Sequence, residues 1–228
     1  MHLEIRQTKD GSNTLYVPDL NEHYHSVHGA LQESQHVFIR QGLEHMLAQK
    51  KDIAVLEVGF GTGLNAILTI PVAVAQQALI RYDTLEKYPL SEEVVKQLHF
   101  EQFILNPELL DNFYQLHASR WNEPIDILPN FTLQKLHETL ENYAAPGNYY
   151  DVIYFDAFAP EKQPELWTDA MFEKLYAATR PGGVLVTYCA KGSFKRSLKA
   201  AGYQVEALPG PPGKREMTRG LKPVAAVN

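Results

Sequence analysis

The stretch Ile53-Ala54-Val55-Leu56-Glu57-Val58-Gly59-Phe60-Gly61-Thr62-Gly63-Leu64-Asn65 joins a short apolar run to a glycine-rich turn. An apolar run of this kind is typical of a strand buried in a parallel sheet. The glycines permit a tight turn and let the backbone approach a ligand closely. The apolar residues 64–77 then favour a helix, which Pro71 bends or interrupts. The stretch therefore predicts a strand, a ligand-binding turn and a helix.

Strand and helix patterns alternate along the rest of the chain. We expect a main sheet of seven strands, at residues 53–56, 79–85, 125–128, 152–155, 184–188, 203–208 and 223–227. Helical patterns at residues 169–179 and 194–201 lie between the later strands. Such alternation indicates an α/β fold with a mostly parallel, doubly wound, Rossmann-like sheet.

Residues 1–50 read as an extension to this core. Residues 3–6 and 14–17 alternate in polarity on either side of Asp10-Gly11, which predicts a small β-hairpin. Residues 21–30 lack periodicity and predict a loop, and residues 31–49 have helical spacing. His23, His25 and His28 have no accompanying group of metal ligands, so we expect no metal site and interpret them as surface residues or a substrate lid.

The length of 228 residues fits a single domain, with residues 1–50 as the extension and 51–228 as the core. Cys189 is the one cysteine, which excludes a disulfide framework within the chain and fits a reducing compartment. We find no signal-peptide pattern at the start and no apolar run long enough to span a bilayer. The sequence therefore predicts a cytoplasmic protein.

The net charge of −6 is unevenly distributed. Residues 180–228 hold nine Lys or Arg against two Glu, a net charge of +7, which leaves −13 on the remainder. This asymmetry indicates either a basic binding face on an acidic body or a merely solvated basic surface. If it is a binding face, its candidates are Lys191, Lys195, Arg196, Lys214 and Arg215.

The glycine turn favours one class of ligand. A dinucleotide-binding turn needs a third glycine where this chain has Leu64, which disfavours an NAD-dependent oxidoreductase. Glu57, just before the turn, would repel a pyrophosphate but suits the cationic amino group of S-adenosylmethionine (SAM). Glu86 follows Gly63 by 23 residues, at the end of the next predicted strand, where an acid can accept hydrogen bonds from both ribose hydroxyls.

A third candidate acid is Asp156, which directly follows the predicted strand at residues 152–155. Ligands in open α/β sheets bind outside the carboxyl ends of the strands, so Asp156 should lie near the glycine turn and Glu86. A carboxylate there can hold an amine nucleophile and take its proton. The alternative is an Asp that only caps a loop.

Several blocks of the sequence resemble the methyltransferase module of the MnmC family, which modifies the wobble uridine of tRNA, and the stand-alone relatives called MnmD. The blocks are residues 26–38, Glu57-Val58-Gly59-Phe60-Gly61-Thr62-Gly63-Leu64-Asn65, Glu86-Lys87-Tyr88-Pro89-Leu90, Asp156-Ala157-Phe158-Ala159-Pro160, Lys162-Gln163-Pro164-Glu165-Leu166-Trp167-Thr168 and Lys214-Arg215-Glu216-Met217. The resemblance implies a SAM-dependent methyltransferase sheet whose last strand is antiparallel. It also implies conversion of 5-aminomethyl(-2-thio)uridine to 5-methylaminomethyl(-2-thio)uridine, with the anticodon region of tRNA as partner.

The resemblance also suggests which residues form the site, with Asp156 as the catalytic residue. The cofactor-binding candidates are Glu57, Gly59, Phe60, Gly61, Gly63, Asn65, Glu86, Lys87, Phe131, Thr132 and Asp156. The substrate-binding candidates are Ser26, His28, Glu33, Phe158, Tyr188, Lys191, Lys214 and Arg215. The family has an acid after its third strand, which here is replaced around Asn130-Phe131-Thr132, so the adenine contact is expected from a backbone carbonyl or Thr132.

Two other functions remain open at the level of sequence. A SAM-dependent methyltransferase of a small-molecule amine would leave the basic region unexplained. A non-catalytic module that binds tRNA or a nucleotide would not need Asp156 beside a SAM-type turn.

Overall fold

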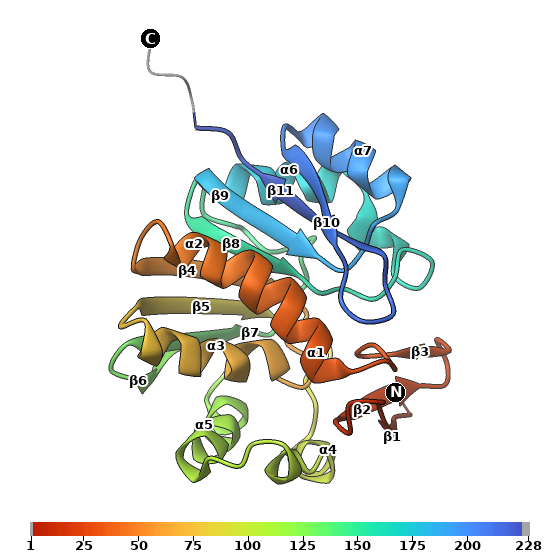
Figure 1. The fold of residues 1–228 in the computed structure, drawn as a ribbon, viewed down its shortest axis with the longest axis vertical. Coiled ribbons are helices and arrows are strands. Elements are labelled where there is room, and N and C mark those ends of the chain that lie inside the picture. Colours follow the sequence, from red (N-terminus) through yellow and green to blue (C-terminus); the bar gives the residue numbers. More distant parts are fainter. Residues whose placement is uncertain (1, 225–228) are drawn as a thin grey trace.

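An eight-stranded sheet crosses the computed structural model, which describes residues 2–224 (Figure 1). In spatial order its strands are β10 (Gln204–Pro209), β11 (Glu216–Leu221), β9 (Thr179–Thr187), β8 (Tyr150–Phe155), β4 (Asp52–Val58), β5 (Leu79–Leu85), β7 (Phe131–Leu136) and β6 (Pro124–Leu128). The five strands from β9 to β7 are parallel, and β11 runs antiparallel to both of its neighbours. The predicted α/β class, with a mostly parallel sheet and an antiparallel last strand, is confirmed.

Two predicted strands need correction. Residues 125–128 form an antiparallel edge strand, because the short turn after Leu128 folds the chain back and β7 becomes the third parallel strand. Among the described residues, the last strand is β11. Its polar residues disguise it in the sequence, although Met217 and Thr218 are fully buried between β9 and β10. Residues 222–224 are not in a strand, and the rest of the predicted range lies outside the described residues.

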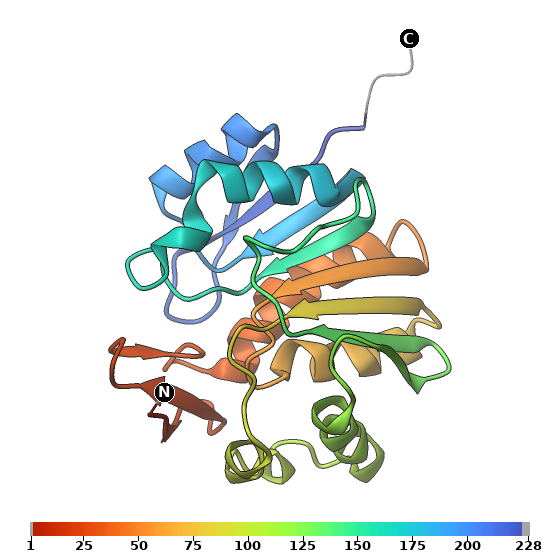
Figure 2. The same cartoon turned by 180° about the vertical axis from the view of Figure 1, so that it is seen from behind.

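Helices cover both faces of the sheet (Figures 1 and 2). One face carries α1 (Ala30–Ser34), the π-helical η1 (Gln35–Glu44), α2 (His45–Leu47), α3 (Leu64–Ala75) and α5 (Pro107–Ala118), and the other carries α6 (Asp169–Ala178) and α7 (Gly192–Ala201). Alternate strand residues serve the two faces, so Val55 and Tyr154 belong to one apolar core while Leu56 and Phe155 belong to the other. Between residues 2 and 224, no helix has both the length and the apolar character needed to cross a membrane.

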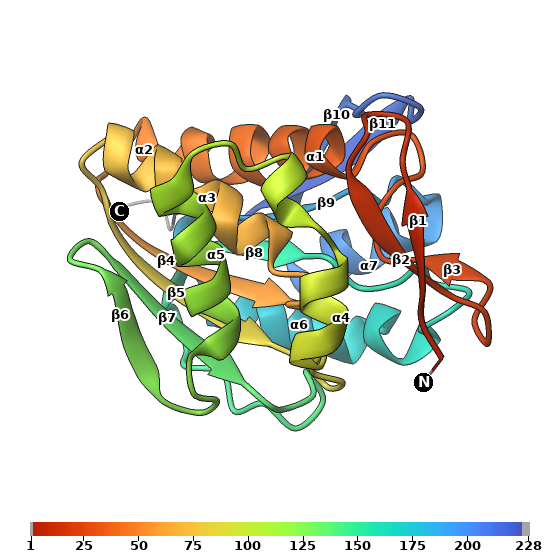
Figure 3. The same ribbon diagram turned by 90° about the horizontal axis from the view of Figure 1, so that it is seen from below.

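Shorter helices complete the connections. They are α4 (Glu92–Gln97), which packs beside α5 as Figure 3 shows, η2 (Phe100–Gln102) and η3 (Pro164–Trp167). η3 follows the loop after β8 and precedes α6.

The N-terminal extension forms its own small sheet of β1 (Glu4–Gln7), β2 (Asn13–Val17) and β3 (Glu22–His23). The predicted hairpin is thus present, with a short third strand added. α1, η1 and α2 run as one helical stretch over residues 30–47, close to the predicted range, and Val37 and Phe38 share an apolar core with Ile67 of α3. The division into residues 1–50 and 51–228 of a single domain stays a prediction.

Gly29 lets the small sheet hold the start of this helix. The side chain of Asp10, between β1 and β2, accepts a hydrogen bond from the backbone N–H of Gln32 (3.2 Å). Gly29 has a φ of +152°, and a Cβ there would lie 2.6 Å from Asp10 Oδ2. Glycine is therefore required for the extension to dock on the helix.

Candidate active site

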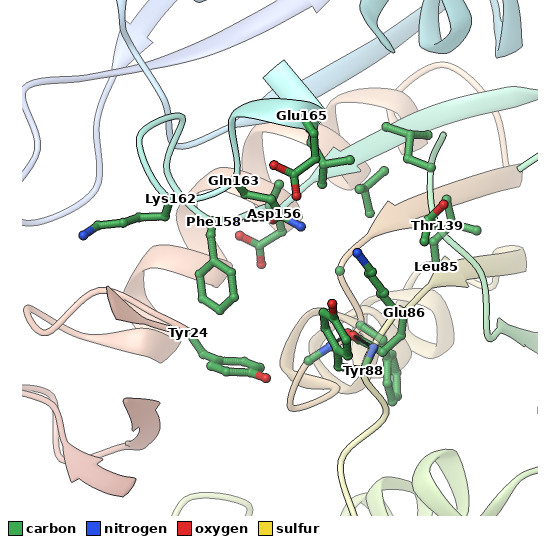
Figure 4. A pocket seen from close by; sticks show the side chains of 18 of the residues that line it. Tyr24, Leu85, Glu86, Tyr88, Thr139, Asp156, Phe158, Lys162, Gln163 and Glu165 are labelled. Atoms are coloured by element: carbon green, nitrogen blue, oxygen red, sulfur yellow. Dashed lines mark hydrogen bonds between the residues drawn. The ribbon is translucent and has the colours of Figure 1, made fainter. Parts of the chain in front are cut away.

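A cavity of about 240 Å³ lies at the carboxyl ends of β4, β5 and β8 (Figure 4). Eight residues that the sequence singled out line it, namely Gly59, Phe60, Gly61, Asn65, Glu86, Lys87, Asp156 and Phe158. The parallel sheet brings them together because its strands end at one edge.

The three glycines of the turn have different surroundings. Gly59 has a φ of +96°, and a Cβ there would lie 2.9 Å from the backbone oxygen of Asp156, so the two loops touch through their backbones. Gly61 presents its N–H to Glu86 Oε2 at 2.9 Å. Gly63 has left-handed backbone at the start of α3, between Phe60 and His117, and is not among the residues that line the cavity. The position of Gly63 thus does not support the predicted cofactor contact. Its left-handed backbone instead lets the chain turn into α3.

Glu86 is held at the cavity edge by the backbone. Besides the bond from Gly61, its Oε1 accepts the N–H of Tyr88 at 2.7 Å. A carboxylate has about four acceptor positions, so two remain for a ligand. A fixed carboxylate with free lone pairs suits a ribose diol, and the glycine turn beside it suits the close approach of a ligand. These residues fit SAM.

Asp156 faces the cavity and is tied to α3. Asn65 Nδ2 donates hydrogen bonds to Asp156 Oδ2 (2.8 Å) and to Glu57 Oε1 (3.0 Å), so one amide bridges two carboxyl groups. Burial raises the pKa of the Asp156 carboxyl to about 7, although the hydrogen bond from Asn65 lowers it. Asp156 is thus ready to exchange a proton near neutral pH.

The predicted contact between Glu57 and the cofactor needs correction. Glu57 is fully buried and is not among the residues that line the cavity. Thr84 Oγ1 donates to its Oε2 at 2.7 Å, and burial raises the pKa of the Glu57 carboxyl to about 8. At neutral pH this group is mostly protonated. It holds Asn65 and lies too deep to meet the amino group of a cofactor.

Phe131 and Thr132 also need correction. They open β7 and so lie at the amino edge of the sheet, away from the cavity. Phe131 is buried with its ring stacked on Tyr82, and Thr132 Oγ1 donates to Asp126 Oδ1 at 2.6 Å. The prediction was wrong because residues 125–128 were interpreted as the third parallel strand. The residues that follow β7 and line the cavity are Glu138, Thr139, Leu140 and Glu141.

The N-terminal extension contributes residues to the cavity; of these, only His25 had been assigned a possible role, in a substrate lid. Leu20, Tyr24 and His25 line the cavity, and the Tyr24 ring packs edge-on against Phe158 with 5.2 Å between centroids (Figure 4). A Cβ on Gly61 would lie 3.1 Å from the Tyr24 ring. Tyr24 therefore closes the cavity between the glycine turn and the loop after β8. The available signal was the aromatic and histidine-rich character of residues 21–30, which lacks a helix or strand period.

η3 and the residues just before it also contribute to the cavity, with residues that were quoted from the sequence without a role. Lys162, Gln163 and Glu165 line the cavity. Gln163 Oε1 accepts the N–H of Phe158 at 3.2 Å, and Trp167 Nε1 donates to the Phe158 carbonyl at 2.8 Å. Gln163 and Trp167 thereby fix the position of Phe158.

The histidines of the extension are separated. The His25 ring lies within hydrogen-bond distance of Thr14 Oγ1 (3.1 Å) and Thr62 Oγ1 (3.3 Å), and burial lowers its pKa to about 4. A neutral His25 thus links the extension to the glycine turn. His23 packs against Tyr16, and among residues 2–224 no three His, Cys, Asp or Glu side chains gather as a metal site would require.

A second, more open hollow of about 490 Å³ lies on the other side of the loop after β8. The loop borders both spaces, since Asp156 and Phe158 line the cavity while Ala159 and Pro160 line the hollow. The hollow is also lined by Tyr188, Cys189, Ala190, Lys191, Lys214, Arg215 and Glu216. Four of the predicted substrate-binding residues therefore line the same hollow, namely Tyr188, Lys191, Lys214 and Arg215.

Not all of the predicted basic residues are free. Lys191 pairs with Glu161, Lys195 pairs with Glu216 (2.9 Å), and Lys214 pairs with Glu33. Within the described part of the chain, Arg196 and Arg215 are exposed and form no ion pair.

Three other predicted substrate residues, Ser26, His28 and Glu33, are linked to one another by hydrogen bonds. The backbone N–H of Ser26 donates to Glu33 Oε1 at 3.2 Å, and the N–H of His28 donates to Ser26 Oγ at 3.2 Å. Ser26, His28 and Glu33 are absent from the residues that line either space. Their predicted direct contact with substrate is therefore not supported by their position.

Known proteins resemble this chain in sequence and in fold. The sequence profile of a family described as S-adenosyl-L-methionine-dependent methyltransferase matches residues 129–223. The tRNA 5-methylaminomethyl-2-thiouridine biosynthesis bifunctional protein MnmC of Cupriavidus necator is 30% identical over 89% of this chain, and that of Cupriavidus metallidurans is 31% identical over 90%. The chain covers 32% of each, and so spans about a third of the length of these curated relatives.

Two solved structures are similar to this chain in fold. MnmC2 from Aquifex aeolicus superposes with a TM-score of 0.76 at 26% identity, covering 96% of this chain and 70% of that one. Spermidine synthase from Thermotoga maritima superposes with a TM-score of 0.55 at 14% identity, covering 96% and 71%, which shows the shared fold alone.

The fold, the cavity at its carboxyl edge and these similarities define the class of protein: the chain is a SAM-dependent methyltransferase, with SAM as its cofactor. Within this class it is an MnmC-like methyltransferase module. The resemblance stated from the sequence is confirmed.

Proposed function

We propose that this protein methylates the primary amine of 5-aminomethyl(-2-thio)uridine at the wobble position of tRNA, giving the 5-methylaminomethyl derivative. The observation that carries the proposal is the position of Asp156. It begins the loop that separates the cofactor cavity from the basic hollow, and Asn65 fixes its carboxyl group at 2.8 Å. In this proposal the nucleophile enters from the side of the hollow and meets the carboxyl group of Asp156 at the cavity.

The cavity residues divide the cofactor between them in this proposal. Glu86 takes the ribose hydroxyls, and the turn of Gly59 and Gly61 takes the amino-acid part. The residues after β7, among them Glu138 and Thr139, replace Phe131 and Thr132 at the adenine end. When bound, SAM supplies an electrophilic methyl group.

Asp156 prepares the amine. An alkylammonium has a pKa near that of lysine, about 10.4, so little free amine exists at neutral pH. Desolvation or the positive charge of bound SAM lowers the pKa of the amine, since a carboxylate alone would favour the cation. The Asp156 carboxylate then orients the amine and accepts its proton, which leaves the nitrogen lone pair free to form the N–C bond. Phe158, held by Gln163 and Trp167, offers a ring on which an extruded base stacks.

The hollow and its surroundings suit an RNA backbone. Arg215 is an exposed cation that lines the hollow together with Lys191, and Arg196 is a further exposed cation on α7. Acidic charge on the rest of the molecule would repel phosphates and help to orient the tRNA towards this side. A tRNA substrate implies a cytoplasmic location.

The test is the nucleoside composition of tRNA in a strain that lacks the protein. We expect 5-aminomethyl(-2-thio)uridine to accumulate by mass spectrometry, and a plasmid with the wild-type chain to restore the methylated nucleoside. A plasmid with Asp156→Asn should not restore it. Unchanged wobble nucleosides in the deletion strain would remove tRNA as the substrate, even if the protein binds SAM.

A further inference from the structure

Lys214 lines the basic hollow, and its charge already has two partners. Its Nζ pairs with the carboxylate of Glu33, whose side chain is 10% exposed, and lies 3.9 Å from the centre of the Tyr188 ring. The Lys214 side chain itself is 31% exposed, whereas the neighbouring Arg215 is an exposed residue. The two adjacent cations therefore occupy different environments.

The partners of Lys214 connect it to the reacting edge of the site. Tyr188 donates its hydroxyl to the carbonyl of Ala157, the residue after Asp156, at 2.8 Å. Glu33 accepts the backbone N–H of Ser26, close in sequence to the cavity residue Tyr24. Lys214 thus joins the loop between β10 and β11 to α1, to the end of β9 and, through Tyr188, to the loop of Asp156.

A contact just before Lys214 supports this role. Gly213, with a φ of +86°, lies so close to the His28 ring that a Cβ there would be 2.4 Å from His28 Cδ2. His36 on η1 lies 2.8 Å from the backbone oxygen of Pro209. The loop between β10 and β11 is therefore packed on the N-terminal extension at several points.

We infer that Lys214, together with Glu33, is a positioning residue of the acceptor side of the active site, and that Arg215 rather than Lys214 binds the RNA phosphate. The inference rests on the proposed function. The charge of Lys214 is already compensated by the carboxylate of Glu33, which reduces its attraction for a phosphate. Arg215 has no such partner among the described residues, and its guanidinium can bind a phosphate through two parallel hydrogen bonds.

The charges around Asp156 support the same division of roles. Asp156 faces Asn65 of α3, Glu33 of α1 and Lys214, with Glu57 of β4 behind Asn65. After burial and the Asn65 hydrogen bond, the charge of Glu33 raises the pKa of Asp156 and that of Lys214 lowers it. Without Lys214, the negative charge of Glu33 would be uncompensated and Asp156 would hold its proton to higher pH.

The experiment compares the adjacent variants Lys214→Met and Arg215→Gln in the purified protein, with tRNA that carries 5-aminomethyluridine. We expect Lys214→Met to move the acidic limb of the kcat/KM profile upward by about one pH unit, a tenfold loss at a fixed pH on that limb. The slope of log K against log salt for tRNA binding should be the same in Lys214→Met as in the wild type. Arg215→Gln should raise the KM for tRNA and lower the slope of log K against log salt by about 0.7 to 0.9, while the acidic limb of the kcat/KM profile stays at the wild-type pH.

Two further variants guard against a folding defect. Lys214→Arg keeps the charge and should restore the pH profile, while Glu33→Gln should move the acidic limb downward. Calorimetric SAM affinity equal to that of the wild type verifies that each variant is folded. A Lys214→Met protein with a reduced salt slope and an unchanged pH profile would overturn the inference, as would an unchanged Lys214→Met protein. Failure of the wild type to methylate this tRNA would instead overturn the proposed function.

Discussion

Asp156 is the residue on which the chemistry depends. Asp156→Asn keeps the size of the side chain and cannot accept a proton from the amine. We expect SAM binding to persist and methyl transfer to fall by about 10²–10⁴-fold, the usual contribution of a general base. Single-turnover transfer measures this directly, and transfer at the wild-type rate would remove Asp156 from the mechanism.

The protonation of Asp156 also predicts a pH dependence. Burial raises the pKa of its carboxyl to about 7, and only the ionised form accepts the amine proton. Below about pH 7, kcat/KM should therefore lose a factor of ten for each pH unit, because kcat/KM reports the pKa of the free enzyme. A profile that is flat from pH 5 to 7 would contradict this account.

Glu86 carries the cofactor contact with the clearest geometry. Its carboxylate is fixed by the N–H groups of Gly61 and Tyr88 and keeps lone pairs for a ligand. Glu86→Ala should weaken SAM binding by about 1–3 kcal/mol, the cost of losing charge-assisted hydrogen bonds. Calorimetry gives the affinity, and an unchanged value would exclude Glu86 from the site.

We expect Glu57 to affect the pH dependence of the stability of the folded chain rather than ligand binding. Its pKa is about 8 in the folded chain against an ordinary value of 4.5, so the folded state holds the proton more tightly than the unfolded state. Its contribution is present in full below about pH 4.5 and is lost as the pH rises to about 8. The melting temperature of Glu57→Gln relative to wild type should therefore rise between pH 5 and pH 9. A difference that is independent of pH would contradict the raised pKa.

At the scale of elements, the sequence predicted the strand, glycine turn and helix at residues 53–77 because each carries a strong local signal. Strands β6 and β11 were misjudged for a physical reason: their place depends on pairing with distant strands. The aromatic character of residues 21–30 is a local signal, but the place of Tyr24 in the cavity depends on how the small sheet docks through Asp10 and Gly29. Glu57 was assigned to the cofactor because its position beside the turn is visible in the sequence, whereas its burial is not.

The glycine turn gives the prediction that belongs to this scale. Gly59→Ala places a Cβ 2.9 Å from the Asp156 carbonyl in a left-handed backbone, so we expect a loss of more than about 1 kcal/mol of stability and of SAM binding. Gly147→Ala is the matched control, since the nearest atom to its Cβ lies 4.0 Å away. Melting temperatures and calorimetry compare the two, and equal behaviour would contradict the close contact of the loops.

At the scale of the whole molecule, the sequence predicted the separation of basic and acidic charge but not which charges are free. Lys191 and Lys214 are paired with Glu161 and Glu33, which lie in other parts of the chain. A count of charges cannot reveal such partners, because they are brought together by the fold. The separation of charge in the sequence therefore indicates a basic side of the molecule. The structure shows which of its cations form no ion pair, such as Arg215.

The central claim is that one methyl group passes from SAM to the amine of a modified wobble uridine. The most direct measurement is a single turnover of the purified protein with SAM labelled in its methyl group and two tRNAs that differ only in the 5-aminomethyl group. The account predicts that one equivalent of label enters the wobble nucleoside of the tRNA with the amine, and none enters its counterpart. Equal labelling of both tRNAs, or no labelling while SAM is bound, would contradict it.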